Sequence, residues 1–450
     1  MNSQSQAASL ESFPPVISDS RLHAPSSRRR ALIFPIKFLW GMLFCQSLAG
    51  GIIVVGWTYR LAQRSALKFW FSQSAAAKSF TDFADFAAEQ VAGQELIHWP
   101  NWFAQQNFRQ TARTSAEVGF FAGAAFLLRS LVQSLWLNFW IGLRAIANTW
   151  AVTLPACVLW WFGWYDGWNN SFGKGYEQAI VGPLLSLFGI AWFIAAMFYL
   201  PLAQARQAVT GQWRSFYQFR LIRQLAKERW IYCVLLAGLY SLLSIPLSIM
   251  KTSPMFWMHN DPALGALTGP QVIAAMKSFF FWCALFVLPA FVILRLVAAR
   301  IYASGLILLV QSGKITFADL AANERTVFER LGLLTTQPEP ELHPVIRAAA
   351  WTGTRVGRVC GRGLLIAVWF SFVAQIYISE FLNYHSGLAW LNQPLVQLPW
   401  FRFLPLSLRN PMADLAAALL LILLATLVRS MVRSFRVLRS GRDGGQNGLF

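Results

Sequence analysis

Charged residues are scarce in this sequence of 450 residues: 13% are charged, whereas 56% are hydrophobic. A soluble chain of this length would need polar surfaces for a few domains, and this composition argues against such an architecture. The apolar residues form continuous runs long enough to cross about 30 Å of hydrocarbon as helices, without the apolar–polar alternation of a transmembrane β-barrel. The composition therefore predicts an all-α integral membrane protein, folded as a polytopic helical bundle.

Motifs for catalysis and cofactor binding are missing as well. The five histidines all lie in predicted tails or loops, so none is placed to hold a haem inside a helical bundle. No HExxH, Walker A, GxSxG or glycine-rich nucleotide-binding pattern occurs. We therefore expect a protein that is not an enzyme and that carries no cofactor and no metal.

Cysteine is rare too, and its five positions show no CxxC spacing. Four of them fall inside predicted membrane helices and one lies at the mouth of such a helix, which favours small packing residues over disulfides or metal ligands. They are Cys45, Cys157, Cys233, Cys283 and Cys360.

Acidic residues number only 19, against 38 basic ones. Arg129 and Arg295 are the only charges placed deep within a predicted span. The carboxylates nearest the membrane fall instead at the ends of spans, and they are Glu117, Asp166, Glu177, Glu380 and Asp414. Because ionisable groups inside the membrane are the usual sign of a proton or ion path, this pattern argues against a proton-coupled transporter.

Hydropathy predicts about eight transmembrane spans, with seven as the alternative. They lie near 34–58, 117–142, 147–165, 178–203, 231–250, 278–299, 363–380 and 413–429. The region 117–142 decides between the two numbers, because Arg129 lies at its centre and the segment could instead lie along the membrane interface. We treat residues 31–439 as one polytopic membrane domain, between a disordered basic tail at 1–30 and a flexible tail at 440–450.

Basic residues are distributed unevenly among the loops. Six lie in residues 206–229 and eight in 300–362, whereas 166–177 and 251–273 contain one each. Loops rich in Lys and Arg usually face the cytoplasm, so we expect both termini on the cytoplasmic side of a bacterial-type inner membrane. The net charge of +19 is then explained by topology and by attraction to anionic lipids, and no nucleic-acid partner is expected.

Two cytoplasmic stretches have the pattern of short amphipathic helices at the membrane interface. The second is expected within 316–334, capped by Thr316. The first lies within 211–230, and its apolar face can sink into lipid or pack against a neighbour; this face comprises Phe216, Phe219, Ile222 and Leu225. Its candidate contacts with lipid headgroups are Arg214, Arg220, Arg223 and Lys227.

Glycines recur every fourth residue before the seventh predicted span. Gly353, Gly357 and Gly361 would lie along one stripe of a helix, where the missing side chains permit close backbone approach. The stripe predicts either a docking groove for a partner helix or cofactor, or packing against another helix of the same chain. We favour packing within the chain. A single GxxxG pattern, Gly119 to Gly123, is also interpreted as helix packing. Off the stripe, the candidate contacts with lipid phosphates are Arg355, Arg358 and Arg362.

Tryptophans cluster in the stretch VLWWFGWYDGW, at the outer end of the third predicted span. On a helix that turns about 100° per residue, five aromatic side chains would fall within an arc of about 140°. They are Trp160, Trp161, Trp164, Tyr165 and Trp168. Such rings lie among headgroups in aromatic belts, whereas a ligand cage needs aromatics on several sides of a cation. We interpret them as an external aromatic ridge that faces lipid or a partner.

These observations leave three hypotheses for the function. The first is a non-enzymatic multi-pass membrane subunit or scaffold that packs against partner membrane proteins. The second is a permease component for a lipid-like or small substrate. The third is a subunit that binds a quinone or another hydrophobic cofactor along the tryptophan surface. Membrane lipids and partner membrane proteins are the expected partners.

Overall fold

The computed structural model describes residues 27–74, 83, 86, 120–164, 180–260, 266–334, 344–382 and 387–400. These residues form helices and short connections, and no strand occurs among them. The chain divides into two units, Met1–Trp40 and Gly41–Phe450. Helix α1 (Ser27–Phe44) supplies the described part of the first unit and ends in the second. The hydrogen bonds, ion pairs and ring contacts of the candidate site lie within the second unit.

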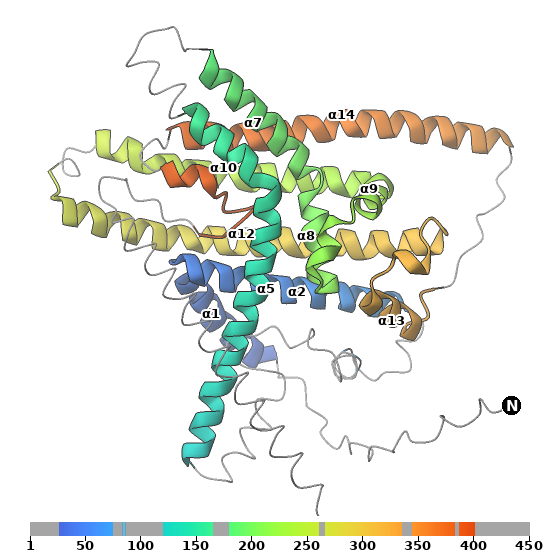
Figure 1. Cartoon of the computed structure of the whole chain (residues 1–450), viewed down its shortest axis with the longest axis horizontal. Helices are drawn as coiled ribbons and strands as arrows, with labels where there is room; N and C mark the ends of the chain where they lie inside the picture. Colours follow the sequence, from blue (N-terminus) through green and yellow to red (C-terminus); the bar gives the residue numbers. More distant parts are fainter. Residues whose placement is uncertain are drawn as a thin grey trace, which may run out of the picture. The chain divides into compact units, whose positions relative to one another are not determined.

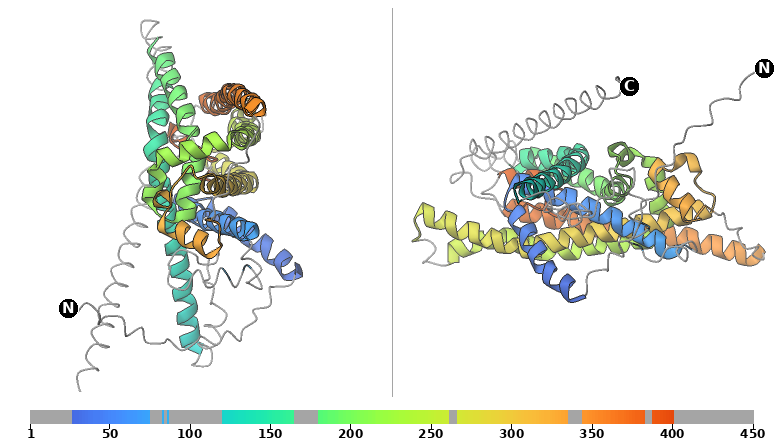
Figure 2. Two further views of the ribbon diagram at one scale, coloured as in Figure 1. Left: turned by 90° about the vertical axis from the view of Figure 1, so that its right-hand side faces the viewer. Right: turned by 90° about the horizontal axis from the view of Figure 1, so that it is seen from below.

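Four long helices of the second unit lie side by side in a layer, in the order α14, α10, α12, α2 (Figure 1, Figure 2). They are α2 (Leu48–Gln73), α10 (Trp230–Asn260), α12 (Gly269–Gln311) and α14 (Pro344–Leu382). Large apolar side chains on their outward faces are exposed, among them Leu235 at 63% and Val359 at 65%. Such faces suit helices that contact lipid.

Helix α5 (Phe120–Phe162) runs across one face of this layer and packs against α2, and α7 (Val181–Met197) packs beside α5 (Figure 1, Figure 2). The chain then bends by 42° into α8 (Leu200–Thr210), which packs against α2 and α12. Every residue of α8 is buried. This short helix therefore lies at the centre of the core.

The predicted spans near 117–142 and 147–165 are a single helix, so the prediction of two spans was wrong here. Helix α5 continues without a break through residues 143–146. The hydroxyls of Thr149 and Thr153 bond to the carbonyls four residues earlier, which satisfies them inside a helix. The part of α5 that is apolar enough to cross a membrane is Leu131–Phe162, so the seven-span alternative, in which 117–142 does not cross, fits this helix better.

The first predicted span, near 34–58, is interrupted. Helix α1 ends at Phe44 and α2 begins at Leu48. Ser47 caps α2, because its hydroxyl accepts a hydrogen bond from the Gly50 amide at 3.0 Å. A polar cap between two apolar runs thus divides what hydropathy treated as one segment.

Fewer helices qualify as spans than the sequence predicted. Among the described residues, four helices are long and apolar enough to cross a membrane: α5, α10, α12 and α14. The bent pair of α7 and α8 makes a fifth if it counts as one span. The predicted span near 413–429 lies outside the described residues. Eight spans are therefore not confirmed, whereas the described residues are helical and include several helices long and apolar enough to cross a membrane.

Both amphipathic stretches are helical. They form η4 (Trp213–Tyr217) with α9 (Phe219–Glu228), and η5 (Phe317–Asp319) with α13 (Ala322–Arg330). Thr316 caps η5 and not the longer α13. The amide and hydroxyl of Thr316 donate to the Asp319 carboxylate at 3.0 and 2.8 Å, and these bonds hold the pKa of Asp319 below its ordinary value.

Two glycines allow α2 and α5 to approach closely. A Cβ atom on Gly56 would collide with the carbonyl of Asn138, and one on Gly142 would collide with the carbonyl of Ile52. The obstructing atoms belong to backbone, which cannot rotate aside as a side chain can. The crossing of these helices therefore requires glycine at both positions.

Candidate functional site: a buried polar network

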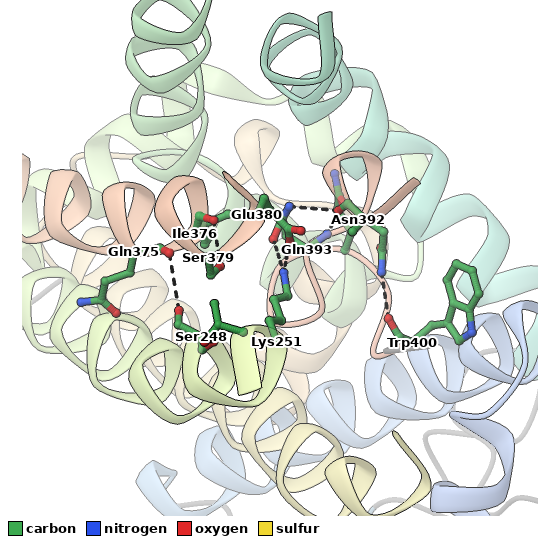
Figure 3. Close-up of polar contacts among 12 residues, drawn as sticks. Ser248, Lys251, Gln375, Ile376, Ser379, Glu380, Asn392, Gln393 and Trp400 are labelled. Atoms are coloured by element: carbon green, nitrogen blue, oxygen red, sulfur yellow. Dashed lines mark hydrogen bonds and ion pairs between the residues drawn. The ribbon is translucent and has the colours of Figure 1, made fainter. Parts of the chain in front are cut away.

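Residues 387–400 form a largely non-helical segment that is buried among the helices. After the short η6 (Gly387–Leu391), the segment places Val396 and Leu398 in the core at 1% and 0% exposure. The Asn392 side chain holds its turn, because Nδ2 donates to the Leu398 and Trp400 carbonyls at 3.1 Å each (Figure 3). Buried irregular backbone carries polar groups that need partners, so it introduces a polar interior.

A buried ion pair joins α10, α14 and this segment. The ammonium group of Lys251 donates to a carboxylate oxygen of Glu380 and to Gln393 Oε1, the latter at 3.0 Å (Figure 3). The side chains of Lys251 and Glu380 are 1% and 0% exposed. Two opposite charges held together in this way neutralise each other, but each depends on the other to remain buried.

Hydrogen bonds continue from this pair into α5 and α8. The backbone N–H of Gln393 donates to Gln397 Oε1 at 2.7 Å, and Gln397 Nε2 donates to the Thr153 hydroxyl at 2.5 Å. That hydroxyl donates to the Thr149 carbonyl at 3.0 Å. The Thr149 hydroxyl accepts from Gln204 Nε2 at 2.9 Å. All these side chains are buried, so the chain of bonds runs inside the protein.

The chain of bonds reaches Arg295 in the middle of α12. Its Nη1 atom donates to Gln204 Oε1 and to the Tyr240 hydroxyl, the latter at 2.9 Å. Its Nη2 atom donates to the Val396 carbonyl at 2.6 Å, and its guanidinium lies 4.6 Å from the centre of the Phe291 ring. These acceptors are all neutral, and no ion pair joins Arg295 to a carboxylate among the described residues.

A second ion pair joins Arg206 to Glu324. It contacts Tyr302, which lies seven residues after Arg295 on α12. Arg206 Nη1 donates to the Tyr302 hydroxyl at 2.7 Å and lies 3.6 Å from a carboxylate oxygen of Glu324. The Tyr302 hydroxyl donates to Glu324, whose other oxygen accepts from the Ala321 amide at 3.0 Å. Seven residues are about two helical turns, so Arg295 and Tyr302 lie on the same face of α12.

A polar seam between α10 and α14 leads to the Lys251 end of the network. Ser241 and Ser371 lie 3.3 Å apart, and the Gln375 amide donates to Ser241 at 3.2 Å. Ser244 donates to Gln375 Oε1, and Ser248 donates to the Gln375 carbonyl at 3.5 Å (Figure 3). The mildly polar face that the serines give α10 is therefore engaged with α14.

The predicted glycine stripe contacts a tryptophan of the same chain. A Cβ on Gly357 would lie 3.8 Å from the Trp230 ring, and one on Gly361 would overlap that ring. Gly353 lies on the same helix, although its surroundings are not described. The Arg355 and Arg362 side chains are exposed, whereas the Arg358 side chain, like Gly119, lies outside the described part. Gly123 is half-buried in α5.

Replacing Gly361 by alanine should destabilise the protein by about 1–3 kcal/mol, because the new methyl group would enter the space of the Trp230 ring. Thermal unfolding in detergent measures this effect. Gly363→Ala is the matched control, since nothing lies within 4 Å of its Cβ position. Adding Trp230→Leu should restore stability to Gly361→Ala; equal melting temperatures for the Gly361 and Gly363 variants would contradict the packing.

The predicted aromatic ridge is divided between the core and the surface. Trp160 is 0% exposed and stacks on Phe193 with ring centres 5.0 Å apart, so it does not lie on an external ridge. Trp164 packs on Trp390 at 6.2 Å, and Trp161 is 38% exposed. Tyr165 and Trp168 lie outside the described residues. Helix α7 and the 387–400 segment cover the face that the sequence predicted to be open.

The apolar face of α9 packs against its own chain. Ile222 and Leu225 are 1% and 0% exposed, and Phe216 in η4 is fully buried. Phe219 is 58% exposed and stacks on Tyr199 at 4.6 Å. The predicted basic residues are all exposed, so headgroup contact remains a prediction for Arg214, Arg220, Arg223 and Lys227.

Sequence reasoning missed the network because it placed Lys251 in a loop and Glu380 at the end of a span. One available signal was the spacing of Ser241, Ser244, Ser248 and Lys251, which places four polar residues on one face of a helix. A helix that continued through Lys251 would have carried its ammonium group into the bundle. Nothing in the local pattern identified Glu380 as its partner.

No known protein family, curated protein or solved structure gives a match to this chain. Within the described ranges, no group of three His, Cys, Asp or Glu side chains could hold a metal ion. Four cysteines that the sequence placed inside predicted spans are free, buried thiols: Cys45, Cys157, Cys233 and Cys283. Cys360 is a free, exposed thiol. The polar network is therefore the feature of the described residues that a proposed function can rest on.

Proposed function

We propose that this protein is a multi-pass membrane permease component for a small anionic solute, with the buried polar network as its pathway. The observation that carries the proposal is Arg295, whose side chain is buried while its hydrogen bonds go to neutral acceptors. A buried charge inside a membrane bundle is costly and commonly marks a substrate or ion path.

The charges of the network support an anionic substrate. Lys251 and Glu380 neutralise each other, as do Arg206 and Glu324. Arg295 then leaves one excess positive charge among these five groups, three basic and two acidic. A guanidinium can bind a carboxylate, sulfate or phosphate through two parallel hydrogen bonds. In the structure, oxygens of Gln204, Tyr240 and Val396 accept hydrogen bonds from this guanidinium.

The buried segment 387–400 supports an alternating pathway. Broken backbone near the middle of a bundle recurs in transporters, where carbonyl groups line the binding site. The Val396 carbonyl bonds to Arg295, so outward movement of this segment would expose the guanidinium. The loops near Lys251 carry few basic residues and the Glu324 region carries many, which supports opposite membrane sides for the two ends. A cytoplasmic Glu324 end in a bacterial-type inner membrane belongs to this proposal.

The scaffold and cofactor hypotheses have less support from the described contacts. The glycine stripe that motivated a partner helix is occupied at Gly361 by Trp230 of the same chain. The quinone hypothesis is based on an exposed tryptophan surface, but Trp160 is buried in the core of the protein. The exposed apolar faces of the long helices need no partner other than lipid.

Proteoliposomes that contain the full chain should take up small anions such as phosphate, sulfate or acetate faster than protein-free vesicles. Arg295→Met should reduce this uptake at least about tenfold, because the variant removes a charge-assisted contact with the solute. Radiolabelled uptake and anion-dependent thermal stabilisation measure transport and binding separately.

Arg300→Met is the matched control, since Arg300 lies one and a half turns farther along α12 and is exposed. It should retain uptake and stabilisation by the anion. If no anion is transported or stabilises the protein, or if Arg295→Met behaves as Arg300→Met does, the permease proposal fails.

A further inference from the structure

A cavity of about 30 Å³ lies where α2, α5 and α8 meet the connection to η4. Arg60 and Gln63 of α2 and Gln207 of α8 form its buried side. Arg144, Gly211 and Trp213, which are exposed, form its mouth. The cavity opens beside the basic stretch that contains α9.

Two guanidinium groups line this cavity, and no carboxylate is among its lining residues. Arg60 is 3% exposed and is oriented by the Asn138 side chain, to which its Nη1 donates at 2.8 Å. A guanidinium stays protonated in proteins, so Arg60 contributes a positive charge at this position. A hollow lined by charge of one sign concentrates ions of the other sign.

Each glutamine of the cavity has one side-chain atom in a hydrogen bond with the protein, and the two arginines are the charged donors among the lining residues. Gln63 Nε2 donates to the Val209 carbonyl at 3.0 Å. Gln207 Oε1 accepts from Asn148 Nδ2 at 3.1 Å, and that nitrogen also donates to the Trp213 carbonyl at 2.9 Å. These bonds tie η4 to α5 and α8, so the walls of the cavity are fixed before any ligand enters.

We propose that this cavity binds a phosphate-type anion, held between Arg60 at its base and Arg144 at its mouth. The cavity is small, so it accepts the phosphate oxygens while the rest of the ligand lies outside. Guanidinium groups match phosphate through parallel charge-assisted hydrogen bonds. Trp213 is 47% exposed at the mouth, as expected for an indole at a membrane interface. The phosphate can belong to an anionic lipid headgroup or to a free ion, and this inference does not depend on the permease proposal.

The test uses the full chain in neutral detergent, titrated separately with inorganic phosphate and with phosphatidylglycerol, and phosphatidylcholine serves as the uncharged-headgroup control. Native mass spectrometry counts retained lipids, and thermal stabilisation follows both ligands. Arg144→Gln should weaken binding at least about tenfold. Because Arg144 is exposed, this substitution should leave the fold intact, whereas Arg60→Gln provides a second test at the buried position.

Arg300→Gln is the matched control, because Arg300 of α12 is an exposed arginine that does not line the cavity. Retention of phosphatidylglycerol that Arg144→Gln weakens and Arg300→Gln does not would assign the site to a lipid headgroup. Stabilisation by inorganic phosphate with the same variant pattern, without lipid retention, would assign it to a free anion. Binding of neither probe, or equal weakening by both variants, would overturn the proposal.

Discussion

Replacing Glu380 by glutamine should lower the free energy of unfolding by about 3–5 kcal/mol. The variant would leave the Lys251 ammonium group buried without an opposite charge, at a site where the lysine side chain is 1% exposed. The same reasoning applies to Lys251→Met, which would leave the Glu380 carboxylate unpaired. Chemical or thermal unfolding in detergent or nanodiscs measures the loss.

The double variant Lys251→Met/Glu380→Gln should be more stable than either single variant, because it removes both charges together. Lys314 and Glu228 provide the matched control, since their ion pair of 2.9 Å is exposed at 45% and 30%. Glu228→Gln should cost no more than about 1 kcal/mol. Equal losses at Glu380 and Glu228, or additive losses in the double variant, would show that the buried pair does not form.

Replacing Gly56 by leucine should prevent α2 and α5 from packing and should cost about 3 kcal/mol or more. The new side chain would meet the Asn138 backbone carbonyl, which cannot move without displacing α5. Gly142→Leu should have a similar effect through the Ile52 carbonyl. Yield of folded protein, size-exclusion behaviour and melting temperature measure the outcome together.

Gly238→Ala is the control for a glycine inside a helix with no close neighbour, because nothing lies within 4 Å of its Cβ position. It should be neutral or stabilising by up to about 1 kcal/mol, since alanine favours the helix. The milder Gly56→Ala tests the same contact if the leucine variant does not fold, and it should still lower the melting temperature. A Gly56→Ala variant as stable as Gly238→Ala would contradict the close crossing.

The sequence predicted those parts of the fold that depend on local pattern. Long apolar runs located α10, α12 and α14, and the amphipathic pattern located α9. It misjudged α5, because two apolar runs in the sequence predict two spans although one unbroken helix contains both. It also joined α1 and α2, although Ser47 provides a cap that local inspection could have found.

The network was harder to predict because its members are distant in the chain. Glu380 lies 129 residues from Lys251, and Gln397 lies 244 residues from Thr153. Each of these residues, considered alone, fits an ordinary loop or helix position. Their meeting depends on residues 387–400 entering the core, and a short stretch rich in Gln, Pro and Leu carries no periodic signal for such insertion.

The transverse course of α5 has a consequence for how the molecule would lie in a bilayer. Helices that cross one another cannot all follow one membrane normal, so a bilayer aligned with α10, α12 and α14 would contain α5 as a crossbar in its plane (Figure 1). With 43 residues at about 1.5 Å each, this crossbar is about 65 Å long. Thr149 and Thr153 belong to α5, so a displacement of α5 in the membrane plane would move the hydrogen bonds that they form with Gln204 and Gln397. Of the four described helices long and apolar enough to cross a membrane, α5 would then be the one that lies in the membrane plane.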